Sequence, residues 1–212
     1  FDVLLAPLLR AMAPRDLLVI TADHGEGFME HGLARHGVHT WEEMIHVPLI
    51  VAGPGVRAGR VDARAFVTDI APTLLERASA DAAPPNSPAL NGVSMSGVLS
   101  GAAAQVRDAN TPVGIEVSGN SALFRGDYKL VRNTPRFGDN IWRLYNIATD
   151  PGETHDLSRE QPQLLESMQA DYAAYARANG VADMPGGYDA QHQAAHNALM
   201  AQFGYYWWAL LI

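Results

Sequence analysis

The strongest constraint on this chain is a short apolar run that ends directly in a polar stretch containing glycines. Residues 17–20 read Leu-Leu-Val-Ile, and residues 21–27 read Thr-Ala-Asp-His-Gly-Glu-Gly. A continuous apolar run of this length is typical of a strand buried on both faces of a parallel α/β sheet. Open α/β sheets bind their ligands at the carboxyl ends of such strands. The sequence therefore predicts a functional site that begins at Asp23.

Composition narrows the class of protein. The chain has 212 residues, of which 48% are hydrophobic, so it can bury a sizeable core and disorder is excluded as its main state. Lys and Arg number 15 against 23 Asp and Glu, which gives a net charge of −8, and no basic patch is visible. Nucleic-acid binding is therefore disfavoured. The absence of cysteine excludes a disulfide framework, a zinc–thiolate site and a cysteine nucleophile within these residues.

Periodicity and turn residues predict two regions of secondary structure. In the first region we expect helices at 4–12 and 69–78 and a second core strand at 47–52, followed by a proline-rich loop at 79–92. In the second region we expect antiparallel strands at 113–117, 121–132 and 141–147, and a helix at 161–178 that stops at Asn179-Gly180.

Asp23 and His24 are the first candidate ligands for a metal ion. Neighbours on a strand point to opposite faces, but a turn after the strand lets both side chains reach one ion, and Gly25 permits such a turn. A carboxylate favours Ca²⁺ or Mg²⁺, and the imidazole keeps Mn²⁺ and Zn²⁺ open. Taken alone, the pair fits a hydrogen-bonded structural role equally well.

Several blocks of the sequence, taken together, carry a family resemblance. They are Thr-Ala-Asp-His-Gly-Glu-Gly-Phe at 21–28, Glu-His-Gly at 30–32, His-Gly at 36–37, Glu-Glu at 42–43, His-Val-Pro-Leu-Ile-Val at 46–51, Val-Thr-Asp-Ile-Ala-Pro-Thr-Leu-Leu at 67–75, Arg-Gly-Asp-Tyr-Lys-Leu-Val at 125–131, and the segment at 144–157. In this order, over about residues 15–180, the chain resembles the sulfatase family of the alkaline-phosphatase superfamily. Ordered blocks are much more specific than any one motif.

The resemblance implies a fold and a domain organisation. The fold class is α/β: the C-terminal part of an alkaline-phosphatase-like α/β core sheet, followed by a small subdomain of antiparallel strands and a packing helix. The expected boundaries are 1–100 for the core, 101–182 for the subdomain and 183–212 for a C-terminal extension. The implied activity is metal-dependent hydrolysis of a sulfate ester, with a formylglycine as the nucleophile.

The resemblance also implies roles for individual residues. Asp23 and His24 match a pair of metal ligands that usually binds Ca²⁺ in the family. His36 falls near a basic family residue that contacts the sulfate and the leaving oxygen, and protonated histidine is a suitable acid for that step. The alignment can slip by one position, so Arg35 is a second candidate there. Arg35 and His39 are assigned to substrate binding.

The other polar residues nearby have mainly structural interpretations. For His31 and His39 the alternative to a functional role is a loop histidine whose hydrogen bonds are satisfied. His46 precedes a buried strand and is expected to be structural. Glu42 and Glu43 are expected on a helix face or in a salt bridge rather than as metal ligands.

The family's Cys/Ser-x-Pro/Ala-x-Arg nucleophile motif and its early Asp-Asp metal pair are not found in the sequence, which begins at Phe1. We therefore expect a C-terminal portion of a sulfatase that is inactive by itself. The alternatives are a phosphate or phosphonate monoester hydrolase or phosphomutase of the same superfamily, because 17–25 also resembles phosphopentomutases, and a non-catalytic binding or assembly module.

The expected partner is a small sulfate ester. The aromatic tail at 205–212 is too short to span a bilayer, so it is expected to pack on the domain or against a partner, including another copy of the chain, rather than on a membrane.

Overall fold

The computed structural model describes residues 2–32, 34–37, 39–79, 89–135, 138–185 and 187–206. The chain divides into two compact units, and the first consists of Phe1–Ala22 with Pro48–Ala109. The second consists of Asp23–Val47 with Asn110–Ile212. The segment that carries the Asp-His pair therefore belongs to the same unit as the C-terminal residues. The domain boundary expected between residues 100 and 101 stays a prediction.

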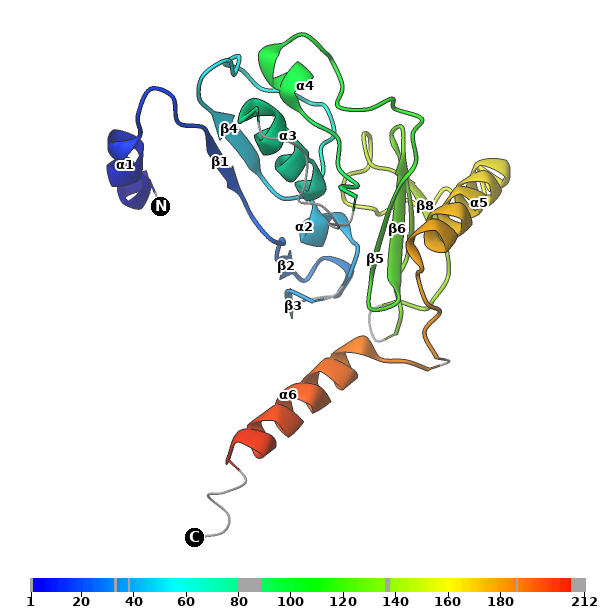
Figure 1. The fold of residues 1–212 in the computed structure, drawn as a ribbon. Helices are drawn as coiled ribbons and strands as arrows, with labels where there is room; N and C mark the ends of the chain where they lie inside the picture. Colours follow the sequence, from blue (N-terminus) through cyan, green and yellow to red (C-terminus); the bar gives the residue numbers. More distant parts are fainter. Residues whose placement is uncertain are drawn as a thin grey trace. The chain divides into compact units, whose positions relative to one another are not determined.

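The first unit contains helices beside a small sheet (Figure 1). Its elements are α1 (Asp2–Ala11), β1 (Leu18–Thr21), β4 (Leu49–Ala52), the 3-10 helix η2 (Val67–Asp69), α3 (Ile70–Arg77) and α4 (Ser96–Ser100). The helices expected at 4–12 and 69–78 and the strands expected at 17–20 and 47–52 are all present, and no boundary shifts by more than two residues. The short helix α4 was not predicted.

The environment of the two strands differs from the expectation. β1 and β4 pair antiparallel, with Val19 opposite Val51, and form a two-stranded sheet. No residue of either strand is fully buried, and Ile50 is 54% exposed. The prediction of a parallel sheet with strands buried on both faces is therefore wrong for the described residues. The physical reason is that neither strand has a second neighbouring strand among those residues.

A buried carboxylate organises the start of α3. Asp69 is fully buried, and its side chain accepts hydrogen bonds from the backbone N–H of Phe66 and of Val93, each at 2.8 Å. The guanidinium of Arg107 pairs with the same carboxylate. A buried charge is stable only when it is paired and hydrogen-bonded, so Asp69 has a structural role in this unit.

The second unit is built on a four-stranded antiparallel sheet in the order β5-β6-β7-β8. Its elements are β2 (Gly27–Phe28), the 3-10 helix η1 (Glu30–Gly32), β3 (Ala34–Arg35), α2 (Glu42–Ile45), β5 (Val113–Val117), β6 (Asn120–Arg125), β7 (Tyr128–Arg132), β8 (Arg143–Asn146), α5 (Pro162–Asn179) and α6 (Ala190–Tyr206). The three expected strand regions and the expected long helix are confirmed. The segment at 121–132 is a hairpin, because the chain turns at Gly126, whose φ is 57°, as the turn residues Arg125-Gly126-Asp127 indicate.

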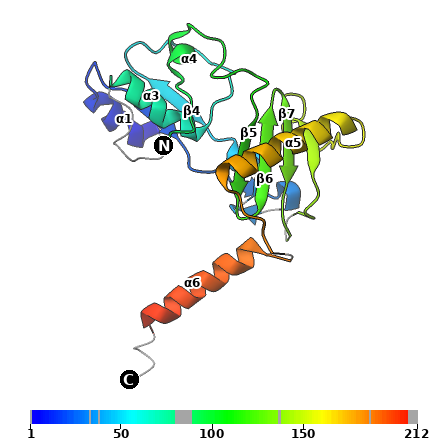
Figure 2. The ribbon, with the colours of Figure 1, turned by 45° about the vertical axis from the view of Figure 1, so that its right-hand side comes forward.

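The two faces of this sheet bury different partners. Helix α5 crosses one face (Figure 2), where Leu130 of β7 packs with Met168 and Tyr172. Side chains alternate along a strand, so the neighbour Val131 points to the opposite face. There Val131 and Tyr145 pack against Trp41, which is 5% exposed. The segment before α2 is thus fixed to the sheet by its own apolar contacts.

Helix α6 was not predicted, because its sequence has no apolar stripe of helical period. Its described side chains are exposed. No helix in the described part of the chain is long and apolar enough to cross a membrane. Residues 207–212 of the aromatic tail lie outside the described residues, as do residues 80–88 of the expected loop.

A buried cation joins α2 to the sheet. Lys129 of β7 is fully buried, and its Nζ lies 3.0 Å from Oε1 of Glu42 and 2.9 Å from Oε1 of Glu153. The other carboxylate oxygen of Glu153 accepts the backbone N–H of Glu42 at 2.7 Å. Burial raises the pKa of Glu153, and the positive charge of Lys129 opposes that rise. Lys129 therefore favours the charged form of this buried carboxylate.

Replacing Lys129 with Met should lower the free energy of unfolding by about 3–5 kcal/mol, because it leaves a buried carboxylate without a partner. Urea unfolding of the 212-residue chain measures the loss. In the variant the pKa of Glu153 rises further, so the folded state takes up a proton at a higher pH than the unfolded state. Its stability deficit should therefore shrink as the pH falls.

Two further variants make this prediction specific. Adding Glu153→Gln to Lys129→Met removes the unpaired charge and should recover part of the loss. Arg60→Ala breaks an ion pair whose Arg60 and Asp62 side chains are 91% and 82% exposed, and it should change little. Equal stability of the Lys129→Met variant and the parent chain would contradict the assigned role.

Candidate functional site

The turn after β1 places Asp23 and His24 together. Nε2 of His24 lies 3.6 Å from Oδ2 of Asp23, and Oδ1 of Asp23 accepts the backbone N–H of His24 at 3.1 Å. Nδ1 of His24 lies 2.7 Å from the carbonyl oxygen of Gly25. A carbonyl only accepts, so Nδ1 carries a proton, and in the neutral ring Nε2 is then the atom with the lone pair. The turn therefore presents a carboxylate oxygen and an imidazole lone pair side by side.

Gly25 is required for this turn by its close approach to α2. Its backbone N–H donates to the carbonyl oxygen of Met44 at 2.7 Å. A Cβ atom at position 25 would stand 1.8 Å from the carbonyl oxygen of Glu43, a distance that no real contact allows. Glycine is therefore needed here for its size, and the backbone of α2 fixes the turn that carries the Asp-His pair.

His36 lies beside this pair and has a carboxylate of its own. The His36 and His24 ring centroids are 4.5 Å apart, with 30° between the ring planes. Nδ1 of His36 lies 3.1 Å from Oε2 of Glu26. A carboxylate on Nδ1 fixes the orientation of the imidazole and leaves Nε2 for another partner. Sequence reasoning missed Glu26, although it lies within the Gly-Glu-Gly of the same block.

The two residues assigned to substrate binding have different settings. The backbone of Arg35 pairs with Gly27 across β2 and β3, and its side chain lies outside the described residues. His39 is 4% exposed, and burial lowers its pKa, which the negative charge of Glu43 partly offsets. Burial therefore favours the neutral form of His39. Its assignment to substrate binding stays a prediction.

His31 is held by contacts on several sides. Its Nδ1 lies 2.8 Å from Oε1 of Glu43, and its ring stacks on Trp41 with 4.0 Å between centroids and 1° between planes. Its Nε2 lies 3.5 Å from the carbonyl oxygen of Glu153. These contacts fit the alternative stated for His31, a loop histidine with satisfied hydrogen bonds, rather than a residue free to bind substrate.

The acidic pair and His46 also have the structural partners expected of them. Glu43 pairs with His31, and Glu42 pairs with Lys129, so both carboxylates of α2 form ion pairs. Nδ1 of His46 lies 3.6 Å from Oε2 of Glu42, one helical turn earlier. Sequence reasoning missed the partners Lys129 and Glu153, although a lysine within an apolar strand is itself a signal that a buried acid lies opposite.

The Asp-His pair fits part of a site for a divalent cation. A metal-bound histidine normally donates its other N–H to a carbonyl or carboxylate, as His24 does to Gly25. The Asp23 oxygen and the His24 lone pair are close enough to share one ion. Among the described residues no group of three or more His, Asp or Glu side chains gathers around one point. The pair therefore supplies two ligands and not a complete coordination shell.

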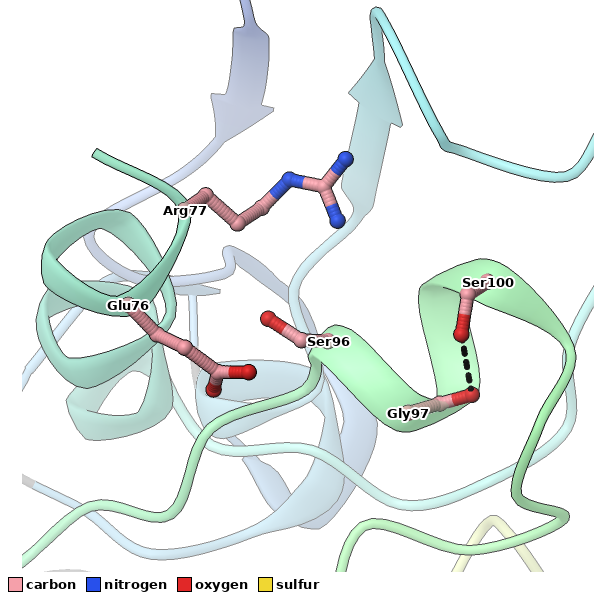
Figure 3. A pocket seen from close by; sticks show the side chains of 5 residues that line it. All are labelled: Glu76, Arg77, Ser96, Gly97 and Ser100. Carbon is pink, nitrogen blue, oxygen red and sulfur yellow. Dashed lines mark hydrogen bonds between the residues drawn. The ribbon is translucent and has the colours of Figure 1, made fainter. Parts of the chain in front are cut away.

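A pocket of about 400 Å³ lies in the first unit and does not involve these residues (Figure 3). It is lined by Glu76 and Arg77 of α3 and by Ser96, Gly97 and Ser100 of α4. The Arg77 guanidinium already donates to the carbonyl oxygen of Pro54, and the Ser100 hydroxyl donates to Gly97. Its polar groups are thus partly occupied by contacts within the unit.

Comparison with known proteins identifies the family. The family model described as Sulfatase matches residues 8–80. Arylsulfatase K of Mus musculus is 30% identical over 79% of this chain and 32% of its own length. The Delta 4,5-hexuronate-2-O-sulfatase of Bacteroides thetaiotaomicron is 29% identical over 75% of this chain and 34% of its own length. This chain thus spans about a third of the length of these curated relatives.

A similar solved structure supports the same family and shows the fold class. The structure of a 2-O GAG sulfatase superposes with a TM-score of 0.64 at 25% identity, and the match covers 85% of this chain and 40% of that one. The chain therefore has the mixed helix-and-sheet architecture of alkaline-phosphatase-like proteins. Within that class it belongs to the sulfatase family.

Replacing Gly25 with Ala should displace the Asp-His turn, because the added Cβ would overlap the Glu43 carbonyl. Overpacking of this kind typically costs about 1–3 kcal/mol of stability. The backbone amide signals of Asp23 and His24 should shift in two-dimensional NMR spectra of the full chain. Gly152→Ala is the matched control, because a Cβ there meets Thr154 at an ordinary 3.5 Å. If both variants are as stable as the parent chain and their amide signals are unchanged, glycine is not required at position 25.

Proposed function

We propose that this chain provides part of the active site of a sulfate ester hydrolase. Membership of the sulfatase family supports the reaction class. The observation that carries the proposal is the group formed by Asp23, His24 and His36, in which the carboxylate and both imidazoles lie together beyond β1. An acid–base residue next to a candidate metal pair is an arrangement that metal-assisted ester hydrolysis uses.

In this proposal Asp23 and His24 would hold a divalent cation. The Asp23 carboxylate favours the hard cation Ca²⁺, and the imidazole leaves Mg²⁺, Mn²⁺ and Zn²⁺ open. When bound, such an ion neutralises negative charge on the sulfate oxygens. Gly25 orients His24 for this role, since its carbonyl accepts a hydrogen bond from Nδ1–H and leaves Nε2 free.

His36 would supply the proton for the departing oxygen. Its Nδ1–H donates to Glu26, which fixes the ring and leaves Nε2 as the atom that exchanges a proton with the substrate. Breaking the ester bond leaves an alkoxide, and a protonated imidazole converts it to an alcohol. The family resemblance implies a formylglycine nucleophile, and its sequence motif does not occur in these 212 residues, so we assign that role to no residue of this chain.

We propose sulfated hexuronate residues as the substrate class. The support is that one similar protein is named a hexuronate-2-O-sulfatase and one similar structure a 2-O GAG sulfatase. The test uses the longest gene product that contains this sequence. Release of sulfate from a 2-O-sulfated unsaturated uronate disaccharide should exceed release from a 6-O-sulfated hexosamine, which is the control.

The same assay separates the reaction classes left open by the sequence. An aryl phosphonate monoester hydrolysed faster than an aryl sulfate would favour the phosphonate hydrolase alternative. Hydrolysis of neither ester would leave only the non-catalytic alternative. Hydrolysis of the aryl sulfate without any preference for the uronate would uphold the reaction and overturn the proposed substrate class.

Asp23→Ala should remove most of the activity of that gene product, because it deletes the anionic ligand of a hard cation. Its Ca²⁺ content should fall together with turnover, and Ca²⁺ binding by the 212-residue chain should weaken in parallel. Asp62→Ala is the control, since its 82% exposed carboxylate pairs only with Arg60 among the contacts described. Full metal occupancy with normal turnover in Asp23→Ala would contradict the ligand assignment.

His36→Ala should slow substrates with poor leaving groups far more than those with good ones. A general acid typically contributes on the order of 10²–10⁴-fold, and the contribution grows as the departing oxygen becomes more basic. The measurement is kcat/KM for a series of aryl sulfates with phenols of increasing pKa. His46→Ala provides a control histidine with a 77% exposed side chain. A loss of equal size across the series would make His36 a positioning residue.

A further inference from the structure

Helix α6 carries two histidines in a composition that is unusual for an exposed helix. Residues 190–206 contain no Asp, Glu, Lys or Arg. His192 and His196 are both exposed, and within the described part of the chain neither imidazole has a hydrogen bond or ion pair. Both rings are therefore available to a ligand, and no cationic side chain of the helix would repel a metal ion.

The spacing of the two histidines puts them on one face. Residues four apart on an α-helix are neighbours, with Cβ atoms about 5–6 Å apart. The adjacent pair shows that side chains one turn apart do meet on this helix, since Nε2 of Gln193 donates to Oδ1 of Asn197 at 2.9 Å. The first turn is regular as well, because the Asp189 carbonyl accepts the backbone N–H of Gln193 at 3.0 Å. The Asp189 side chain caps this turn, since its Oδ1 accepts the backbone N–H of His192 at 2.9 Å.

We propose that His192 and His196 form a binding site for a divalent transition-metal ion. Neutral imidazole suits Zn²⁺, Ni²⁺ and Cu²⁺, whereas Ca²⁺ and Mg²⁺ prefer oxygen ligands. Two imidazoles on one helix act as a chelate, because the second ring binds without a further loss of translational freedom. The negative charge of Asp189, one turn before His192, adds favourable electrostatics for a cation.

This site is independent of the proposed sulfate ester hydrolase. It uses different residues from the Asp23–His24 pair, and neither of its two ligands is a carboxylate, so it does not favour Ca²⁺. The test therefore starts from the 212-residue chain carrying Asp23→Ala and His24→Ala, so that the other candidate pair cannot contribute. Either proposal can fail without affecting the other.

Calorimetric titration of that parent chain with Zn²⁺ should show a site that depends on both histidines. His192→Ala or His196→Ala should each weaken the binding by on the order of 100-fold, the scale of a lost chelate partner. The imidazole C–H signals of His192 and His196 should shift together in two-dimensional NMR spectra on adding Zn²⁺. Alanine is a strong helix former, so these variants should retain α6.

The decisive variant exchanges His196 and Asn197, written His196→Asn with Asn197→His. It keeps the composition but moves one imidazole about 100° around the helix axis. It should bind Zn²⁺ as weakly as the single alanine variants. His155→Ala, which removes a 65% exposed histidine paired with Glu160, should bind like the parent. Unchanged affinity in the exchanged variant, or no Zn²⁺ binding by the parent, would overturn the proposal.

Discussion

The position of helix α2, which supports the Asp-His turn, depends on one buried cation. Lys129 lies in the sheet between the carboxylates of Glu42 and Glu153, all three of them mostly or wholly shielded from water. A buried charge without a partner costs several kcal/mol, so each of these groups is tolerable only when the others are in place. The ion pairs of Lys129 with Glu42 and Glu153 therefore form only when α2 is in one position relative to β7. We infer that its main contribution is to define that arrangement rather than to add net stability.

A series of contacts connects this buried ion pair to the Asp-His turn. Glu42 is the first residue of α2, and Met44 of the same helix accepts the N–H of Gly25. The carbonyl of Gly25 in turn accepts a hydrogen bond from Nδ1–H of His24. Beside this path Trp41 packs on Val131 and Tyr145 and stacks with His31. The buried contacts of α2 and Trp41 thus set the position of the turn, and the exposed Asp23 and His24 side chains remain accessible to a ligand.

The sequence predicted the elements of the C-terminal sheet well, because alternation, turn residues and a capped helix are local signals. The strand expected at 113–117 has those bounds, and Gly180 ends α5 in a left-handed conformation with φ at 65°. The direction of β1 was not predictable. A run of four apolar residues shows that a strand is present, but it does not show which strand pairs with it or how many neighbours cover it.

The sequence also predicted those candidate site residues that lie close together in the chain, because their motif is a local signal. It did not predict ion-pair partners that are distant in the chain. Asp23, His24 and His36 fall within one short stretch. The separation between Glu42 and Glu153, by contrast, is 111 residues, and that between Glu42 and Lys129 is 87. A lysine within an apolar strand indicates that it needs an acidic partner, but a single sequence does not show which acid that is. Helix α6 was missed because its residues follow no helical period of hydrophobicity, so the periodicity argument had nothing to detect.

The attraction between Asp23 and His24 does not explain their arrangement. Their side chains are 89% and 43% exposed, and even two full charges near 4 Å would interact by only about 1 kcal/mol in water. An exposed pair of this strength does not fix a geometry. The backbone does so instead, because Gly25 is held against α2 by a hydrogen bond and by a contact that admits no side chain. The Asp-His pair is therefore preorganised by its supports, which is the condition for two weakly interacting groups to act on the same ion.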